Sequence, residues 1–309
     1  MPTSATAAPA SGPAINRALL LFFPALQLFQ LVVLPVWLLP RDAAWGWLLL
    51  VPVLLSNGWW AFIHDAIHGS LFQDKAANRL AGRLNAILYG AAFDLLRWGH
   101  LLHHAYNRTA RDRTEVYVAG QDDRPRFAAD YYFRLFGGLY LFEVLGALIH
   151  LLPRTLILRA SRRPGGAHNV VEIVTGKLLQ PATLRAVRID GASVLALHAL
   201  AFALYGEHAW MLLLALAGRA LLISLVDNAF HYATPLDDTR FGRNLVLPAW
   251  ASALVLHFNL HGAHHLRPNL PWWALPAYHR QSGAGFQQGW FAALFAQLRG
   301  PIEERRLRG

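Results

Sequence analysis

The chain has 309 residues, of which 55% are hydrophobic and only 15% are charged, and its formal net charge at pH 7 is +10. This composition excludes an ordinary water-soluble domain and indicates a membrane protein. The positive charge does not indicate a nucleic-acid partner, because the arginines bracket apolar segments and form no basic face with interleaved aromatic residues. Because it lacks cysteine, the chain has no disulfide and no thiolate ligand for zinc or an iron–sulfur cluster.

The N-terminal part contains the first pair of predicted membrane spans. Residues 1–15 are rich in small residues and proline and predict a disordered tail, so a single membrane domain is expected over residues 16–309. Residues 18–39 and 44–63 are each apolar and long enough, at about 1.5 Å per residue, to cross a bilayer. A short polar break separates them, and flanking basic residues place both ends of the predicted hairpin on the cytoplasmic side.

Two segments rich in charge follow this hairpin. Residues 71–98 alternate between apolar and charged residues, which predicts an interfacial helix and not a span. Residues 108–134 are dense in Arg, Asp and Glu and predict a solvated cytoplasmic region. Asp112 and Glu115 in this region are candidate partners of metal-binding histidines, although a plain surface position is the simpler expectation.

Residues 136–152 are the ambiguous element, because they are almost hydrophobic enough to span but contain Glu143 and His150. Residues 192–205 with their flanks and residues 209–226 predict a second hairpin. The two crossings of this second hairpin return the chain to the cytoplasm. A third crossing, by residues 136–152, would leave the later histidines on the opposite face of the membrane from the first two motifs. We therefore expect residues 136–152 to lie in the interface or to dip into the membrane. The predicted fold is all-α, with four transmembrane helices in two hairpins and a cytoplasmic helical cap.

Arg219 lies within the last predicted span. A charge at that depth is costly and marks a functional hypothesis. The simpler expectation is that its aliphatic stem carries the guanidinium group toward the cytoplasmic surface.

Histidines form three motifs, HDAIH, HLLHH and HGAHH, which end or follow the predicted spans. On a helix, positions i, i+3 and i+4 lie on one face, so each motif presents its imidazoles toward one point. The HxxHH pattern occurs twice, which chance makes improbable in a chain with 15 histidines. The candidate metal ligands are His64, His68, His100, His103, His104, His261, His264, His265 and a ninth, His231, one turn after Asp227. Outside these motifs, single histidines predict core or surface positions: His150, His168, His198, His208, His257 and His279.

Nine neutral imidazoles are too many for one ion and imply two metals. Ligand type alone permits zinc, copper, iron or nickel. A site beside a bilayer suits an apolar substrate, and breaking an unactivated C–H bond requires activated oxygen, which favours iron.

The three motifs resemble the histidine boxes of the membrane fatty acid desaturase and hydroxylase superfamily, over about residues 50–280. The resemblance implies a di-iron site with O₂ as co-substrate on the cytoplasmic side of a four-span bundle. Some family members have a water-mediated asparagine one turn before the additional histidine, and here Asp227 holds that position with Asn228 beside it. Asp65, inside the first motif, is a candidate to orient a ligand imidazole.

By the same resemblance, the expected function is fatty acyl desaturation, with acyl hydroxylation and carotenoid ring oxidation as the alternatives. The closing HGAHHLRPNLPWW is also similar to the ending of bacterial carotenoid ketolases. The implied partners are membrane lipids, a fatty acyl substrate linked to lipid, CoA or a carrier protein, and an external electron donor such as ferredoxin. The expected location is a bacterial inner membrane, with the active site facing the cytoplasm. A haem-bearing electron carrier is disfavoured, because His198 is the only histidine in mid-span, and a transport protein has no use for metal-binding triplets.

Overall fold

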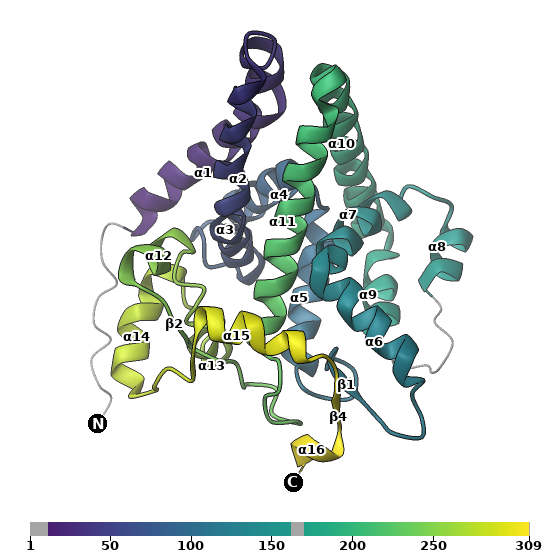
Figure 1. Cartoon of the computed structure of the whole chain (residues 1–309), viewed down its shortest axis with the longest axis vertical. Helices are drawn as coiled ribbons and strands as arrows, with labels where there is room; N and C mark the ends of the chain where they lie inside the picture. Colours follow the sequence, from purple (N-terminus) through teal and green to yellow (C-terminus); the bar gives the residue numbers. More distant parts are fainter. Residues whose placement is uncertain (1–11, 162–169, 309) are drawn as a thin grey trace.

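The computed structural model describes residues 12–161 and 170–308, which are mostly helical (Figure 1). Residues 1–11 of the expected tail and the single His168 therefore lie outside the described residues. The first helix begins at Gly12, before the expected domain start at residue 16. The N-terminal elements are α1 (Gly12–Leu28), the π-helical stretch η1 (Phe29–Leu38), the 3₁₀ stretch η2 (Ala43–Leu49), α2 (Leu50–Leu54), α3 (Ser56–His68), α4 (Lys75–Tyr89) and α5 (Phe93–Tyr106).

The middle of the chain contains shorter helices followed by two long ones. These elements are β1 (Val116–Tyr117), α6 (Arg124–Phe133), η3 (Arg134–Gly138), α7 (Leu139–Ile149), α8 (Arg154–Ser161), α9 (Val170–Leu178), α10 (Pro181–Tyr205), η4 (Gly206–His208) and α11 (Ala209–Ala229). The C-terminal part has only short elements, namely β2 (Leu245–Val246), α12 (Ala249–Leu254), α13 (His261–Leu266), η5 (Trp272–Ala274), α14 (Leu275–Ser282), β3 (Gln288–Gly289), α15 (Trp290–Ala296), η6 (Gln297–Arg299), β4 (Ile302–Glu303) and α16 (Arg305–Arg308).

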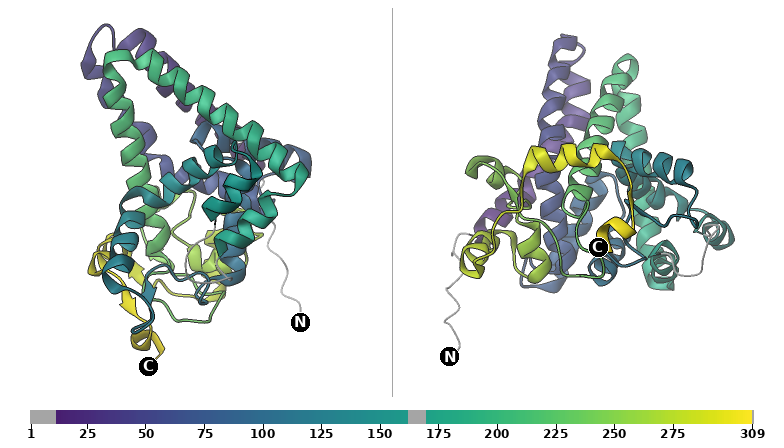
Figure 2. Two further views of the ribbon diagram at one scale, coloured as in Figure 1. Left: turned by 90° about the vertical axis from the view of Figure 1, so that its right-hand side faces the viewer. Right: turned by 60° about the horizontal axis from the view of Figure 1, so that its bottom comes forward.

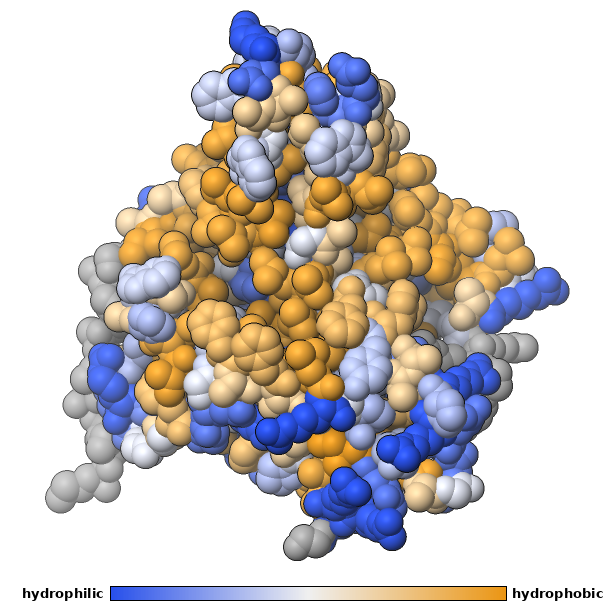
Figure 3. All heavy atoms as spheres, viewed as in Figure 1, coloured by the Kyte–Doolittle hydropathy of each residue, from blue (hydrophilic) through white to orange (hydrophobic). Residues whose placement is uncertain are grey.

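Four helices are long and apolar enough to cross a membrane, judged by length and composition: Gly12–Leu38, Ala43–His68, Arg124–Ile149 and Pro181–Ala229. The last includes the turn at η4, where the chain reverses between α10 and α11 (Figure 2). Hydrophobic residues cover a broad band of the surface, with hydrophilic residues at the tips and at the opposite end (Figure 3). These features fit an integral membrane protein.

The Arg124–Ile149 run contains the ambiguous residues 136–152, and it is not one straight helix. Phe136 and Gly137 have non-helical backbone angles, and Gly137 has a φ of 121° that favours glycine. The 10 residues of α6 and the 11 of α7 are separated by this kink. Each part extends about 15 Å, which is half the thickness of the hydrocarbon core. The interfacial placement of residues 136–152 stays a prediction.

The expectation that Arg219 extends to the surface is wrong. Its side chain is only 1% exposed. The guanidinium group donates to the carbonyl oxygen of Tyr89 at 3.2 Å, and it lies 5.4 Å from the ring of Trp59. It also donates to the side-chain oxygens of Gln27 at 3.2 Å and Gln30 at 3.3 Å. Because polar and aromatic partners surround the cation inside the bundle, it does not need to reach water.

Two short parallel strand pairs tie the C-terminal segment to loops near the histidines. Val116 of β1 pairs with Ile302 of β4, and Leu245 of β2 pairs with Gln288 of β3. The main core includes Trp59, Phe62 and Phe230. This core fixes α3 against α5 and α11, and thereby fixes the ends from which the histidine motifs emerge.

Candidate metal centre

Four segments deliver the predicted histidines to one region. His64 and His68 occupy the end of α3, and His100, His103 and His104 lie along α5. His231 follows α11 directly, and α13 carries the third motif. Because i, i+3 and i+4 residues share a helical face, each segment aims its rings in one direction.

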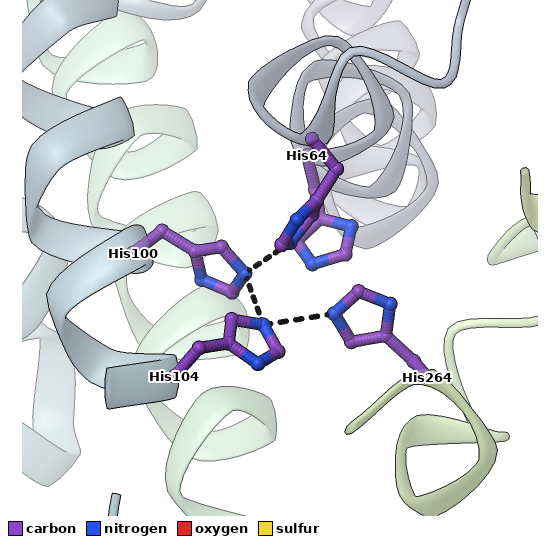
Figure 4. A group of neighbouring side chains, drawn as sticks. His64, His100, His104 and His264 are labelled. Carbon is purple, nitrogen blue, oxygen red and sulfur yellow. Dashed lines mark hydrogen bonds between the residues drawn. The ribbon is translucent and has the colours of Figure 1, made fainter. Parts of the chain in front are cut away.

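The structure divides all nine histidines into two groups, within each of which the possible ligand atoms lie within 4.8 Å of one another. The first group, which we call the five-histidine group, combines three segments. His100 Nε2 lies 2.9 Å from His68 Nε2 and 2.9 Å from His104 Nε2, and His104 Nε2 lies 3.0 Å from His264 Nε2. Figure 4 shows His100 and His104 pointing toward His64 and His264. Its members are His64, His68, His100, His104 and His264.

The second, four-histidine group combines His103, His231, His261 and His265. His231 Nε2 lies 3.2 Å from His103 Nε2 and 3.1 Å from His261 Nε2. His265 Nε2 lies 3.1 Å from His261 Nε2. The second and third motifs each contribute to both groups, so the groups are neighbours in one centre.

The donor atoms fit metal ions better than they fit one another. A neutral imidazole nitrogen carries either a proton or a lone pair, so a ring of converging Nε2 atoms cannot satisfy all its members by mutual hydrogen bonds. Among the described residues, His64 Nε2, His231 Nδ1 and His261 Nδ1 are buried without a hydrogen-bond partner. A cation at the centre of each group would accept every converging lone pair. The clusters can therefore bind metal.

Burial keeps the imidazoles outside the candidate spans neutral. Burial and the neighbouring imidazoles hold the pKa values of His231, His261 and His264 well below the ordinary value. Neutral rings offer the lone pairs that a metal ion needs.

His103 differs because Asp112 contacts it. Its Nδ1 lies 2.6 Å from Asp112 Oδ2. Burial lowers the pKa of His103, but this carboxylate outweighs burial, and the net shift is upward. A proton held on Nδ1 leaves Nε2 free for a metal, which is the usual role of a carboxylate behind a ligand histidine. The simpler expectation of a plain surface position for Asp112 is wrong.

Glu115, the other candidate partner of the histidines, instead pairs with Arg108. The two side chains are each 1% exposed and lie 2.7 Å apart. Arg108 also donates to the carbonyl oxygen of Thr234 at 2.8 Å, and Thr234 Oγ1 donates to the carbonyl oxygen of His231 at 2.8 Å. Sequence reasoning missed Arg108 and Thr234, because the hydrogen bond that joins them spans 126 positions and their residue types signal no chemistry.

Asp65 does not orient His64 by a direct hydrogen bond, because Oδ1 and His64 Nδ1 are 3.9 Å apart. Instead, Asp65 Oδ2 accepts a hydrogen bond of 2.9 Å from the backbone N–H of Trp272. It therefore ties the end of α3 to the segment after the third motif.

Asp227 and Asn228 belong to neither histidine group. Asn228 donates to Gln297 Oε1 at 2.7 Å and accepts from Thr114 Oγ1 at 3.2 Å, so its amide is engaged elsewhere. The described single histidines also lie outside both groups. Three of them bond locally: His150 Nδ1 to the carbonyl oxygen of Gly146 at 2.6 Å, His198 Nδ1 to that of Val194 at 2.9 Å, and His257 Nδ1 to Ser252 Oγ at 2.8 Å.

A family model described as fatty acid desaturase matches residues 42–292, which include all three histidine motifs and His231. The chain therefore belongs to the fatty acid desaturase family. This family implies an oxidoreductase and a fatty acyl substrate. A search of curated proteins finds no match to the chain.

Proposed function

We propose that the protein is an O₂-dependent fatty acyl desaturase that uses two iron ions and electrons from an external donor. The observation that carries this proposal is the convergence of nine imidazoles from four segments into two adjacent groups within a chain of this family. When bound, iron would supply the activation of O₂ that cleavage of an unactivated C–H bond requires.

The chain's own residues would hold the ions and protect them from water. In this proposal the five-histidine group holds one iron and the four-histidine group holds the other. An aromatic ring packs on one histidine of each group: the ring of Phe230 is centred 4.4 Å from that of His261, and the ring of Phe258 is 5.1 Å from that of His64. Such an apolar wall excludes water from the reacting carbon. Asp112 would keep the Nδ1 proton on His103, while Asp65, Asp227 and Asn228 would act at most indirectly.

We propose four crossings, with α10 and α11 as one hairpin, the first two spans as another and all histidine motifs on the cytoplasmic side of a bacterial inner membrane. Parity and the flanking arginines support this topology. Reporter fusions after Pro40 and Glu207 should report the far side, and fusions after Arg113 and Arg240 the cytoplasm. A fusion near Arg159 that reports the far side would contradict the interfacial placement of residues 136–152.

Metal analysis tests the ligand assignment. We expect about two irons per chain, with loss of iron after His103→Ala combined with His264→Ala, because this pair removes one ligand from each group. The matched control is His208→Ala, which removes an imidazole outside both groups. An active preparation that contains zinc alone would refute the assignment.

The reaction is tested by expressing the protein with ferredoxin and its reductase in a host that makes only fatty acids and in one that also makes β-carotene. New double bonds in acyl chains, lost in His261→Ala, would support desaturation. Hydroxylated acyl chains would instead indicate a hydroxylase, a close variant in which the carbon radical captures oxygen and does not lose a second hydrogen. Keto-carotenoids with unchanged acyl chains would overturn the proposal in favour of ring oxidation.

A further inference from the structure

An open depression of about 380 Å³ lies on the surface beside the third histidine motif. Its lining includes Arg240, Gly242, Gly262, Leu266 and Ala284. Two of these residues, Gly262 and Leu266, belong to α13, which also carries His261, His264 and His265. The depression therefore lies on the outer side of the helix whose inner side completes both histidine groups.

The wall between this depression and the four-histidine group is one residue thick at Gly242. A methyl group added at Gly242 would lie 3.2 Å from His265 Cδ2 and 3.3 Å from His261 Cδ2. The backbone of Gly242 thus packs directly on two ligand rings while it lines the depression on its other side. Gly262 is equally constrained, because its added methyl group would lie 2.4 Å from the carbonyl oxygen of Gly242.

One arginine lines the depression, and a second follows one of its lining residues in the sequence. Arg240 is exposed and lies across its edge, with a guanidinium nitrogen 3.5 Å from the carbonyl oxygen of Leu266. Arg267 follows Leu266 and is also exposed. Asp238 is the acidic residue of the lining, and its carboxylate accepts a hydrogen bond of 3.1 Å from the backbone N–H of Arg240. Within the lining the charge of Asp238 balances that of Arg240, so the excess positive charge here comes from Arg267 beside Leu266, in a chain whose net charge is +10.

The proposed reaction needs a reductant that the chain does not contain. Removing two hydrogens from an acyl chain while one O₂ becomes two waters consumes two further electrons and two protons. Each electron oxidises one molecule of a reduced one-electron carrier, and the protons come from solvent. Without cysteine the chain holds no iron–sulfur cluster by its own thiolates. Electrons therefore come from another molecule, and the depression is a surface that only the backbone of Gly242 separates from two ligand rings.

We propose that the depression lined by Arg240 and Gly242 is the docking site of an acidic, soluble one-electron carrier protein. The inference rests on the proposed function. Acidic side chains of the carrier contact Arg240 and Arg267, and its redox centre faces Gly242. Electrons then pass through this thin wall to His261 and His265. Opposite charges on the two surfaces speed association and set orientation.

The test compares two double charge reversals, Arg240→Glu with Arg267→Glu at the depression, and Arg126→Glu with Arg154→Glu as the matched control. Arg126 and Arg154 are exposed on α6 and α8, on the side of the molecule away from α13 and α14 (Figure 1). Binding of an acidic [2Fe–2S] ferredoxin to the purified protein is measured at low and high salt. Turnover is measured with reduced ferredoxin and, separately, with reduced methyl viologen.

We expect the first pair to weaken ferredoxin binding about tenfold or more at low salt and to raise the KM for ferredoxin. Turnover with methyl viologen and the KM for acyl substrate should stay unchanged. High salt should reduce the difference between variant and parent, because it screens surface charges. The control pair should have little effect.

The docking site would be overturned if both double variants weakened ferredoxin binding equally, or if Arg240→Glu with Arg267→Glu left that binding unchanged. A raised KM for acyl substrate alone would also overturn it, since the depression would then hold a substrate head group. If the parent protein shows no turnover with either reductant, the proposed function fails. The binding measurement still decides the docking site in that case, because it does not depend on turnover.

Discussion

Asp112 Oδ2 lies 2.6 Å from His103 Nδ1, on the side of the imidazole ring away from His231. This contact fixes the tautomer of His103, because a carboxylate accepts a hydrogen bond from Nδ1–H and thereby leaves the lone pair on Nε2. His103 is also the member of the four-histidine group that comes from α5. Asp112 therefore controls how the second motif joins that group.

We expect Asp112→Asn to weaken iron retention by about 10- to 100-fold, because an amide can donate to Nδ1 and favour the wrong tautomer. Titration of the purified variant with a competing chelator measures this loss. Asp122→Asn is the matched control, since Asp122 accepts a hydrogen bond from the backbone of Val118 and contacts no described histidine. Parent-like iron affinity in Asp112→Asn would show that the carboxylate does not position the ligand.

The Arg108–Glu115 ion pair gives a prediction on stability. Both side chains are 1% exposed, so Arg108→Met leaves a buried carboxylate without its cation. We expect the free energy of unfolding to fall by about 3–5 kcal/mol in Arg108→Met. The double variant Arg108→Met with Glu115→Leu should recover most of this loss. The apparent Tm in detergent reports both changes. Arg113→Ala breaks a more exposed ion pair with Glu304 and should cost about 1 kcal/mol or less. Equal losses from both arginines would refute the argument.

The contacts of the buried Arg219 lead to a second prediction on stability. Arg219→Leu leaves the carbonyl oxygen of Tyr89 and two glutamine side chains without their shared donor. We expect a loss of about 2–4 kcal/mol, seen as a lower apparent Tm. Arg219→Lys should recover only part of it, because an ammonium group cannot reproduce the planar fork of donors. A parent-like Tm in Arg219→Leu would show that these contacts add no stability.

Helical spacing was sufficient to predict that the histidines of each motif lie near one another. It was not sufficient to predict the two groups, because the structure places His103 and His264 in different groups from the other histidines of their motifs. The sequence was also sufficient for the apolar helices within residues 12–68 and 181–229, but not for the candidate span Arg124–Ile149, whose first part was expected to be solvated. It was not sufficient for Arg219, because Gln27 and Gln30 are about 190 positions away, and no local pattern relates them to an arginine. The same holds for Arg108, whose acceptor Thr234 lies in a loop after α11.

Asp65 and Asp112 show the same limit for carboxylates near a metal ligand. Asp65 is adjacent to His64 in sequence and is a candidate to orient a ligand imidazole, yet its carboxylate accepts a hydrogen bond from the backbone of Trp272. Asp112 is nine positions from His103, and the turn after α5 brings it within hydrogen-bond distance. Adjacent helical residues point in different directions, so sequence neighbours are poor candidates for this role.

The metal-free protein should lose stability as the pH falls below about 6.5, the ordinary pKa of histidine. Burial lowers the pKa values of six histidines that belong to the two groups and lie outside the candidate spans, namely His100, His104, His231, His261, His264 and His265. Below about pH 6.5 the unfolded chain binds protons at these positions and the folded chain does not, so stability rises with pH in that range.

His103 acts in the opposite direction. Its raised pKa makes the folded state bind a proton more readily than the unfolded one, so its contribution is present at low pH and is lost as the pH rises through the raised value. The contribution of His103 alone does not cancel the opposite contributions of the six histidines whose pKa values are lowered. The apparent Tm of chelator-treated protein between about pH 8 and 5 measures the net effect, and it should fall steadily toward acid. His264→Leu should make this dependence shallower, by at most about one proton, because it removes one of the six titrating rings. His208→Ala should leave it unchanged. A Tm that is constant, or that rises toward acid, would mean that these imidazoles are not held neutral in the folded chain.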